Sequence, residues 1–227
     1  MKNLKEANEK LINFWDEWFK KVEPQKINPD DAKIGNELDQ YLKELGDVSE
    51  KILDLGTGTG YGLLMAKLLG KKVKYGLGID PAKNAINYIE KTCELSGIKD
   101  VEFRVGNHKN LNDFSDGYFD GIICSNVLDV VPEETSNDMI KEISRLLKPN
   151  GLFVLKINFY LTDELIKKIN MEEVAKNTYT INGIVRGLNF TVDEWVKRLK
   201  EFELVKTGEF ERIKNGPKDR VLMLKKI

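Results

Sequence analysis

The feature that most constrains the fold is a run of glycines directly after a short apolar segment. Residues 52–60 spell Ile-Leu-Asp-Leu-Gly-Thr-Gly-Thr-Gly, so three glycines occupy alternate positions. Glycine adopts positive φ angles and lets a ligand approach the backbone closely, and open α/β sheets bind ligands outside the carboxyl ends of their strands. The pattern therefore predicts a strand, a ligand-binding loop and a helix, in that order. The alternative is a tight strand-to-helix turn without a ligand.

Strand-like and helix-like segments alternate after residue 50. We expect strands at 51–56, 73–80, 101–106, 119–126 and 152–158, and helices at 60–70, 82–96 and 133–147. Gly97 is placed to end the second of these helices. The alternation predicts a parallel sheet covered by helices on both faces.

The flanking segments follow different patterns. Apolar residues at helical spacing predict a helix over 4–22, and a second helix over 31–45 is expected to end at Gly46. After the fifth strand we expect a charged helix at 162–177, a β-like stretch at 178–190, and a helix at 192–202 capped by Thr191 or Asp193. Two β-like segments, 202–213 and 220–227, are joined by a loop whose Asn215-Gly216 pair predicts a hairpin.

Composition excludes several classes of protein. Lys plus Arg is 36 and Asp plus Glu is 37, and the resulting charge of -1 gives no reason to expect a nucleic-acid partner. The two cysteines, Cys93 and Cys124, lie far apart, so we expect no disulfide, no metal site and a reducing compartment. The sequence shows neither a secretory signal nor an apolar run of the roughly 20 residues that span a bilayer. We therefore expect a cytoplasmic protein without a membrane partner.

Two carboxylates narrow the choice of ligand. Asp54 precedes the first glycine, where it would repel a pyrophosphate but could orient an ammonium group or the loop itself. The dinucleotide pattern G-x-G-x-x-G also fails, because its third glycine position is Tyr61. Asp80 ends the second predicted strand, where a carboxylate can accept both hydroxyls of a ribose. Asp80 could also cap a helix that begins at Pro81.

The glycine loop and the Gly-Ile-Asp that ends at Asp80 together resemble a known family. They resemble motif I and the acidic strand end of class I S-adenosylmethionine-dependent methyltransferases, and the resemblance runs from about Lys51 to Leu155. It implies a Rossmann-like α/β three-layer sandwich. Its sheet would have seven mostly parallel strands with an antiparallel C-terminal strand, which the predicted hairpin would supply.

The resemblance also implies a site for S-adenosylmethionine. Its methionine part would lie against the glycine loop, its ribose would meet Asp80, and its adenine would lie near the loop after the third strand. The expected cofactor-binding residues are Asp54, Gly56, Thr57, Gly58, Gly60, Asp80, Pro81, Ala82, Asn107, His108, Ser125 and Asn126. The family often has Asp where this chain has Asn107, which could instead be a turn residue.

Methyl transfer needs positioning more than a covalent nucleophile, although an acceptor proton can require a base. Asp129, where many relatives have His, is the best candidate base, whereas His108 is expected at the adenine edge. Trp15 and Trp18 could form part of a lid near the cofactor, or simply pack the first helix. Tyr160 and Arg186 are candidate substrate contacts, and Arg186 could clamp a carboxylate or phosphate unless it forms a surface ion pair.

We expect one methyltransferase domain over 1–227, with a helical lid (1–46), a cofactor-binding core (51–158), a substrate-side insertion (159–190) and a C-terminal helix and hairpin (191–227). The favoured function is methyl transfer to a small-molecule acceptor by a monomer or homodimer. Ser125-Asn126-Val127-Leu128 does not match the Pro-Pro segment of DNA amino-methylating enzymes. The alternatives are an NAD-type oxidoreductase and a non-catalytic cofactor-binding module.

Overall fold

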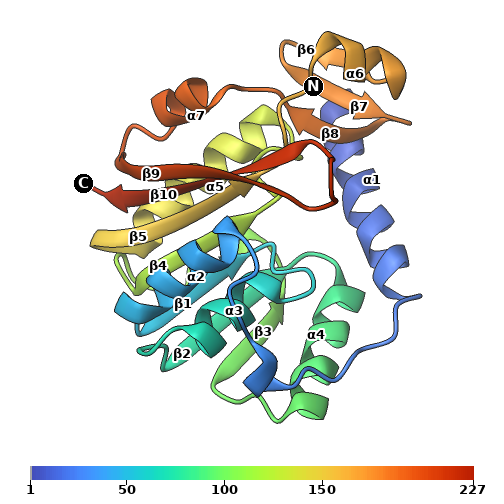
Figure 1. The fold of residues 1–227 in the computed structure, drawn as a ribbon. Coiled ribbons are helices and arrows are strands. Elements are labelled where there is room, and N and C mark those ends of the chain that lie inside the picture. The colour runs from blue at the N-terminus through green and yellow to red at the C-terminus, as the bar shows by residue number, and fades with distance from the viewer. Residues whose placement is uncertain (1) are drawn as a thin grey trace.

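A computed structural model describes residues 2–227 and confirms the predicted class of fold. Figure 1 shows a central sheet with helices on both faces. The helices are α1 (Lys2–Phe19), α2 (Glu37–Val48), α3 (Tyr61–Leu69), α4 (Lys83–Ser96), α5 (Glu133–Leu146), α6 (Asp163–Lys168) and α7 (Val192–Arg198), with short 3-10 turns η1 (Pro29–Asp31) and η2 (His108–Asn110). The strands are β1 (Lys51–Leu55), β2 (Tyr75–Asp80), β3 (Val101–Val105), β4 (Phe119–Ser125), β5 (Leu147–Ile157), β6 (Glu172–Ala175), β7 (Thr178–Ile181), β8 (Ile184–Leu188), β9 (Phe202–Glu211) and β10 (Lys218–Lys226).

The main sheet has seven strands in the order β3-β2-β1-β4-β5-β10-β9. The first five strands run parallel, and β10 pairs antiparallel with both β5 and β9. The order reverses between β1 and β4, and ligands of open α/β sheets bind at such a switch point. The predicted antiparallel C-terminal strand is therefore confirmed, and it lies between β5 and β9 instead of at the sheet edge.

Alternate residues of each strand pack on opposite faces of the sheet. Ile52, Ile123 and Val154 pack against α2, α3 and α4, whereas Leu53 and Leu155 pack against α5 and α7. This period of two is what a strand buried on both faces requires. Both faces are apolar, which explains why the strands appear in the sequence as short continuous apolar runs.

Gly46 does not end its helix, so that prediction is wrong. The helix α2 continues to Val48, and a Cβ on Gly46 would lie 2.0 Å from the carbonyl oxygen of Ala66 in α3. The glycine is needed because α2 and α3 approach each other closely at this point. Gly97, by contrast, ends α4 as predicted, with a φ of 66°.

Only the first part of the helix predicted at 162–177 is confirmed, and the rest of that prediction is wrong. Helix α6 ends at Lys168, Asn170 adopts a φ of 53°, and residues 172–175 form β6, which pairs with β7. Strand pairing supplies the backbone hydrogen bonds of this segment and overrides its helical propensity. The strands β7 and β8 are joined through Asn182-Gly183, with φ angles of 52° and 71°, which are typical of a type I′ turn.

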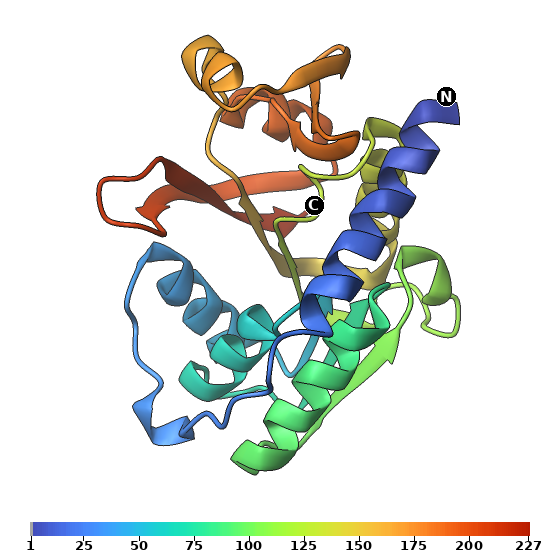
Figure 2. The same cartoon turned by 90° about the vertical axis from the view of Figure 1, so that its right-hand side faces the viewer.

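Helix α1 connects this small sheet to the main one (Figures 1 and 2). The Arg186 guanidinium of β8 lies 4.5 Å from the Phe14 ring centroid. Nearer the end of the helix, the Asp16 carboxylate accepts hydrogen bonds from the backbone and side chain of Asn84 on α4, at 2.8 and 2.9 Å. The helix thereby crosses the carboxyl ends of the parallel strands. No helix within 2–227 has the length and apolarity to cross a membrane.

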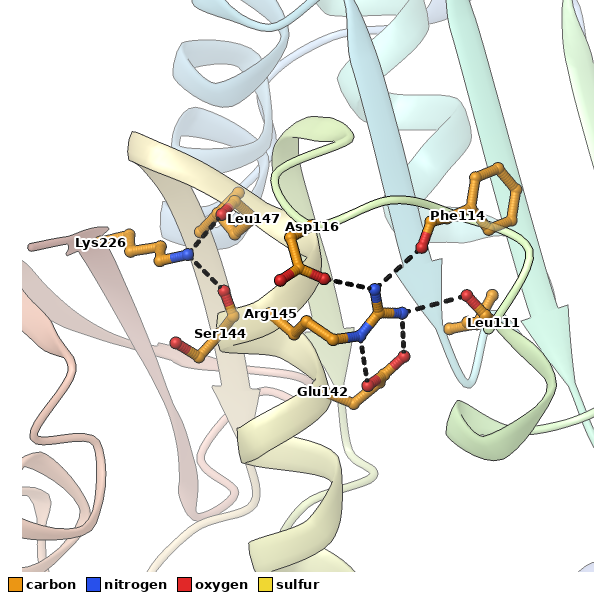
Figure 3. Close-up of polar contacts among 8 residues, drawn as sticks. All are labelled: Leu111, Phe114, Asp116, Glu142, Ser144, Arg145, Leu147 and Lys226. Atoms are coloured by element: carbon orange, nitrogen blue, oxygen red, sulfur yellow. Dashed lines mark hydrogen bonds and ion pairs between the residues drawn. The ribbon is translucent and has the colours of Figure 1, made fainter.

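Arg145 in the last turn of α5 ties down the segment that follows β3 (Figure 3). Its guanidinium donates to the carbonyl oxygens of Leu111 and Phe114, at 3.1 and 2.8 Å, and pairs with Glu142. Charge-assisted bonds to fixed backbone groups are among the stronger polar contacts. The segment that follows His108 is therefore anchored to α5.

Candidate functional site

A cavity of about 820 Å³ opens at the carboxyl ends of the central strands. It brings together the glycine loop, the end of β2, the loop after β3, the end of β4 and one face of α1. The predicted site residues that line it are Trp15, Trp18, Asp54, Gly56, Thr57, Gly58, Asp80, Pro81, Ala82, Asn107, His108, Ser125 and Asn126. Gly60 does not line it. This glycine precedes α3 with a φ of 75°, and a Cβ there would lie 2.3 Å from Ile89.

Most backbone N–H groups of the glycine loop donate hydrogen bonds to other groups of the protein. The N–H groups of Gly56 and Thr57 both donate to the carbonyl of Ile79, at 2.8 and 3.1 Å, and Gly60 donates to Thr57. Gly58 donates to Asp80. Gly58 adopts a φ of 49°, and a Cβ there would meet only the Phe19 ring, at 3.8 Å, so this position opens into the cavity.

Asp54 orients the loop. Its carboxylate accepts from the Thr57 hydroxyl at 2.9 Å and from the Leu63 backbone at 3.3 Å, and the side chain is buried. Burial raises the pKa of Asp54 from 3.8 to about 7, since the charged form loses its hydration. The sequence predicts that Asp54 orients either an ammonium group of the ligand or the loop itself. Its contacts in the structure are those that orient the loop.

Asp80 joins the loop to the next strand. One carboxylate oxygen accepts from the Gly58 backbone at 3.0 Å and the other from the Ala82 backbone at 2.9 Å. Helix α4 starts at Lys83 with Ala82 as its N-cap, so Asp80 is not the helix cap. A carboxylate has about four acceptor sites, so both oxygens can still accept from a ligand. Burial raises its pKa.

The loop after β3 presents an unpaired imidazole nitrogen. Asn107 forms a capping box with Asn110 and accepts from the Lys109 backbone at 2.9 Å, so it acts as the turn residue that the alternative predicted. His108 is buried, and its Nε2 has no hydrogen-bond partner within the described chain. Burial lowers the pKa of His108, so the ring is neutral near pH 7 and can accept or donate one hydrogen bond.

The lining of this first cavity is acidic. Among the described residues, five carboxylates and two lysines line it: Glu9, Asp54, Asp80, Glu134 and Asp138 against Lys5 and Lys109. A ligand with net positive charge is therefore favoured over a polyanion.

A second cavity of about 400 Å³ adjoins the first. The two share Leu11, Trp15, Asn126 and Val130 as a common wall. Asp129 and Arg186, two of the predicted catalytic and substrate residues, line this second cavity and not the first. Tyr160 lines neither cavity and is 46% exposed, although its ring centroid lies 5.9 Å from the guanidinium of Arg220, which lines the second cavity.

Asp129 is buried at the end of β4 with one oxygen unpaired. Its Oδ2 accepts from the backbone and side chain of Asn158, at 2.8 and 2.7 Å, whereas Oδ1 is buried without a partner. Burial is the main cause that raises the pKa of Asp129. Asp129 lines the second cavity, and a carboxylate with a raised pKa at a cavity wall is a candidate general base.

Asn126 is held in a left-handed conformation in the common wall. Its φ is 56°, and its side-chain oxygen accepts from the Lys156 ammonium group, which also pairs with Asp219 at 2.7 Å. Strained backbone of this kind is found where function fixes a side chain. The Asn126 amide nitrogen is buried without a partner in the described chain.

Sequence reasoning missed three residues of the second cavity: Asn158, Arg212 and Arg220. Arg212 and Arg220 come from the C-terminal hairpin and reach the cavity because β10 pairs with β5, where Arg220 lies opposite Ile157. No local motif marks them. They could have been placed beside β5 only from the strand order of the family, in which the last strand of the chain pairs with the fifth.

Comparisons with known proteins agree with this geometry. The profile of a family described as "Methyltransferase domain" matches residues 47–207. A ubiquinone biosynthesis O-methyltransferase of Methylococcus capsulatus is 30% identical over 138 residues, which are 60% of this chain and 53% of that protein. An uncharacterised protein of Rickettsia prowazekii is 34% identical over 128 residues, 52% of this chain and 50% of its own length. The chain thus spans about half the length of these curated relatives.

Solved structures share the fold. The PH0226 protein of Pyrococcus horikoshii superimposes with a TM-score of 0.67 at 19% identity, covering 93% of this chain and 99% of that one. A 1,6-didemethyltoxoflavin-N1-methyltransferase of Burkholderia thailandensis, solved with its acceptor and S-adenosylhomocysteine, gives 0.65 at 18% identity and covers 87% and 80%.

Proposed function

Because this chain belongs to the class I S-adenosylmethionine-dependent methyltransferases, as the family match over residues 47–207 establishes, we propose that it transfers the methyl group of that cofactor to a small-molecule acceptor. The observation that carries the proposal is the chemistry of the first cavity. Its lining is acidic, and the glycine-loop amides of Gly56, Thr57 and Gly58 are bonded within the protein.

The residues present fit this cofactor. S-adenosylmethionine has a sulfonium, an ammonium and a carboxylate group, so its net positive charge matches a lining with five carboxylates and two lysines. The Asp80 oxygens can still accept from ribose hydroxyls, and His108 lines the part of the cavity where the adenine would lie. The open backbone at Gly58 leaves room for the methionine part.

The same features disfavour an NAD-type oxidoreductase. Dinucleotide sites bring a diphosphate onto free N–H groups at a helix N-terminus. In this chain Gly56 and Thr57 donate to Ile79, and Gly58 donates to a carboxylate. A diphosphate would have to displace these bonds and then lie beside buried acidic groups.

In the proposed reaction the protein positions the reactants and excludes water. When bound, the cofactor supplies a methyl group activated by its sulfonium. Trp15 and Asn126, in the wall common to both cavities, would flank the path between donor and acceptor. Asp129 would take the acceptor proton, while Asn158 holds its carboxylate in place through two hydrogen bonds to Oδ2. Orientation alone can lower such a barrier by roughly 7–11 kcal/mol.

The second cavity is the proposed acceptor site. Its volume of about 400 Å³ fits a small molecule. Segment 159–190 would be the substrate-side insertion, since Leu161, Ile181 and Leu188 line this cavity. Segment 1–46 would be the lid, since α1 lines both cavities, with 51–158 as the cofactor-binding core and 191–227 completing the single domain.

A methyl-transfer assay tests the proposal. Purified protein is incubated with methyl-labelled cofactor and a bacterial extract, separated by size into small molecules and macromolecules, with Asp80→Ala as the control. We expect label to enter the small-molecule fraction only, and less of it with the variant. Label in macromolecules alone would contradict the small-molecule acceptor. Binding of the cofactor without transfer to either fraction would favour the non-catalytic module.

A further inference from the structure

The two cavities have linings of opposite charge. The first is acidic, as described above. In the second, three arginines and one carboxylate are the charged side chains among the described lining residues: Arg186, Arg212 and Arg220 against Asp129. Arg220 is buried and Arg186 half-buried, whereas Arg212 is half exposed. Because charges shielded from water need partners of opposite sign, the second cavity favours a ligand that carries negative charge.

Two of the three arginines have structural partners. Arg220 is 5% exposed, and its guanidinium donates to the carbonyl oxygens of Asn158 and Phe190 at 2.7–3.0 Å. Arg212 pairs with Asp219, with 2.6 Å between Nε and Oδ2. Both guanidinium groups are therefore fixed in place.

The acidic partner Asp219 does not by itself neutralise this wall. The same Oδ2 atom also pairs with the Lys156 ammonium group at 2.7 Å, so one carboxylate serves two cations. Asp129 and Glu209 are the other carboxylates near Arg220, and burial raises the pKa of Asp129. Lys156, Arg212 and Arg220 are thus matched by Asp219, Glu209 and Asp129, so the unmatched positive charge at the second cavity is that of Arg186.

Arg186 has no carboxylate partner in the described chain. Its guanidinium lies over the Phe14 ring, 4.5 Å from the centroid, and its side chain is half-buried. Burial is the sole cause that lowers its pKa, and no carboxylate lies near enough to raise it. The predicted surface ion pair is therefore not formed, and Arg186 lines the second cavity without an anionic partner in the described chain.

We propose that the methyl acceptor is a small organic anion whose carboxylate or phosphate group pairs with Arg186, an inference that rests on the proposed function of this site. Arg186 anchors the anionic end by a planar, charge-assisted contact. The acceptor atom lies toward Asn126 and Asp129, in and beside the wall shared with the cofactor cavity. The acidic cavity would thus hold the cation and the basic cavity the anion.

The test compares benzoate, phenyl phosphate and the neutral benzamide as probes, each titrated by calorimetry into the protein saturated with S-adenosylhomocysteine. We expect at least one of the two anions to bind about tenfold or more tightly than benzamide. The stronger of the two identifies the anionic group. Titration of S-adenosylhomocysteine alone comes first, so that its failure to bind would reject the proposed function separately from this inference.

Three variants assign the preference to Arg186. Arg186→Met keeps the length of the side chain without its charge and is expected to lose the preference, whereas Arg186→Lys is expected to keep part of it. Lys168→Met is the matched control, because Lys168 is an exposed cation on the same insertion that lines neither cavity. S-adenosylhomocysteine affinity reports that each variant is folded.

Three results would overturn the inference. The first is equal affinity of the wild-type protein for benzamide and both anions. The second is a preference for anions that survives in Arg186→Met. The third is the absence of binding by either anion up to about 10 mM, while S-adenosylhomocysteine binds normally.

Discussion

The backbone N–H of Gly58 donates a hydrogen bond to the Asp80 carboxylate, with 3.0 Å between the nitrogen and Oδ2. The contact joins the glycine loop to the end of β2, so one side chain both shapes the loop and faces the cofactor cavity. Removing it leaves a partly buried donor unpaired in addition to losing a ligand contact.

Asp80→Ala is expected to weaken S-adenosylhomocysteine by about 1–3 kcal/mol, the range for loss of a buried hydrogen-bonded group. Calorimetric titration measures the change. Asp113→Ala, which removes an exposed carboxylate outside the cavity, is the control and is expected to bind normally. Equal affinity of the two variants would contradict the role of Asp80.

Gly58→Ala and Gly97→Ala form a matched pair. Both glycines have positive φ angles, 49° and 66°, so each substitution is expected to destabilise the fold by about 1–2 kcal/mol. The two positions differ in their surroundings. Gly58 lines the cavity, so a Cβ there would enter it, whereas Gly97 lies at the end of α4, lines neither cavity and has no neighbour within 4 Å. Ligand affinity should therefore fall for Gly58→Ala alone, and a loss shared by both variants would contradict this account.

Asp129→Asn tests the proposed base. The amide keeps the size of the side chain but cannot take a proton, so turnover is expected to fall by roughly 10²–10⁴-fold while S-adenosylhomocysteine still binds. Because the pKa of Asp129 is raised, wild-type turnover should increase with pH as the carboxyl ionises. The pH profile of turnover, measured with the small-molecule fraction of the extract as the source of acceptor, checks this. A variant with wild-type turnover would remove Asp129 from the mechanism.

Asp54→Asn isolates one contribution to the pH dependence of stability. The folded-state pKa of Asp54 is raised from 3.8 to about 7, so the folded protein binds this proton more tightly than the unfolded chain does. That stabilisation is full below about pH 4 and is lost as pH rises through about 7. The difference in free energy of unfolding between variant and wild type should shift in favour of the variant over this window. Denaturant titrations at several pH values measure it, and a constant difference would contradict the burial of this charge.

Trp15→Ala tests the lid. Trp15 lines both cavities and Trp18 only the first, and both rings are partly exposed. We expect Trp15→Ala to weaken both S-adenosylhomocysteine and the acceptor, and Trp18→Ala to weaken only S-adenosylhomocysteine. If cofactor affinity and turnover both remain at wild-type values in Trp15→Ala, α1 is not a lid and only packs against the domain.

The sequence predicts the part of the first cavity that is formed by strand ends, because those residues follow strands in a fixed local order. Apart from Trp15 and Trp18, the residues that α1 and α5 contribute are not predicted, since they reach the cavity through tertiary packing. The loop at 56–60 and Asp80 each follow or end a parallel strand, and the carboxyl ends of neighbouring parallel strands lie side by side. Their position at strand ends therefore predicts that both contribute to the cavity. The second cavity is different. Arg212 and Arg220 reach it through pairing of β10 with β5, and no local spacing encodes that pairing.

Local propensity also misplaced two elements for identifiable reasons. Gly46 resembles a helix stop, but it is required by the close approach of α2 to α3, which is a tertiary contact. Residues 172–175 have a helical composition, but pairing with β7 makes them a strand. The errors therefore fall where partners distant in the sequence decide the conformation.

The central claim is that the first cavity fits an adenosyl sulfonium and not a diphosphate. Parallel calorimetric titrations of the wild-type protein with S-adenosylmethionine, S-adenosylhomocysteine and NADH test it most directly. The account predicts saturable heat with the first two ligands and none with NADH. Binding of NADH alone, or no heat with either form of the adenosyl cofactor at roughly millimolar concentration, would contradict it.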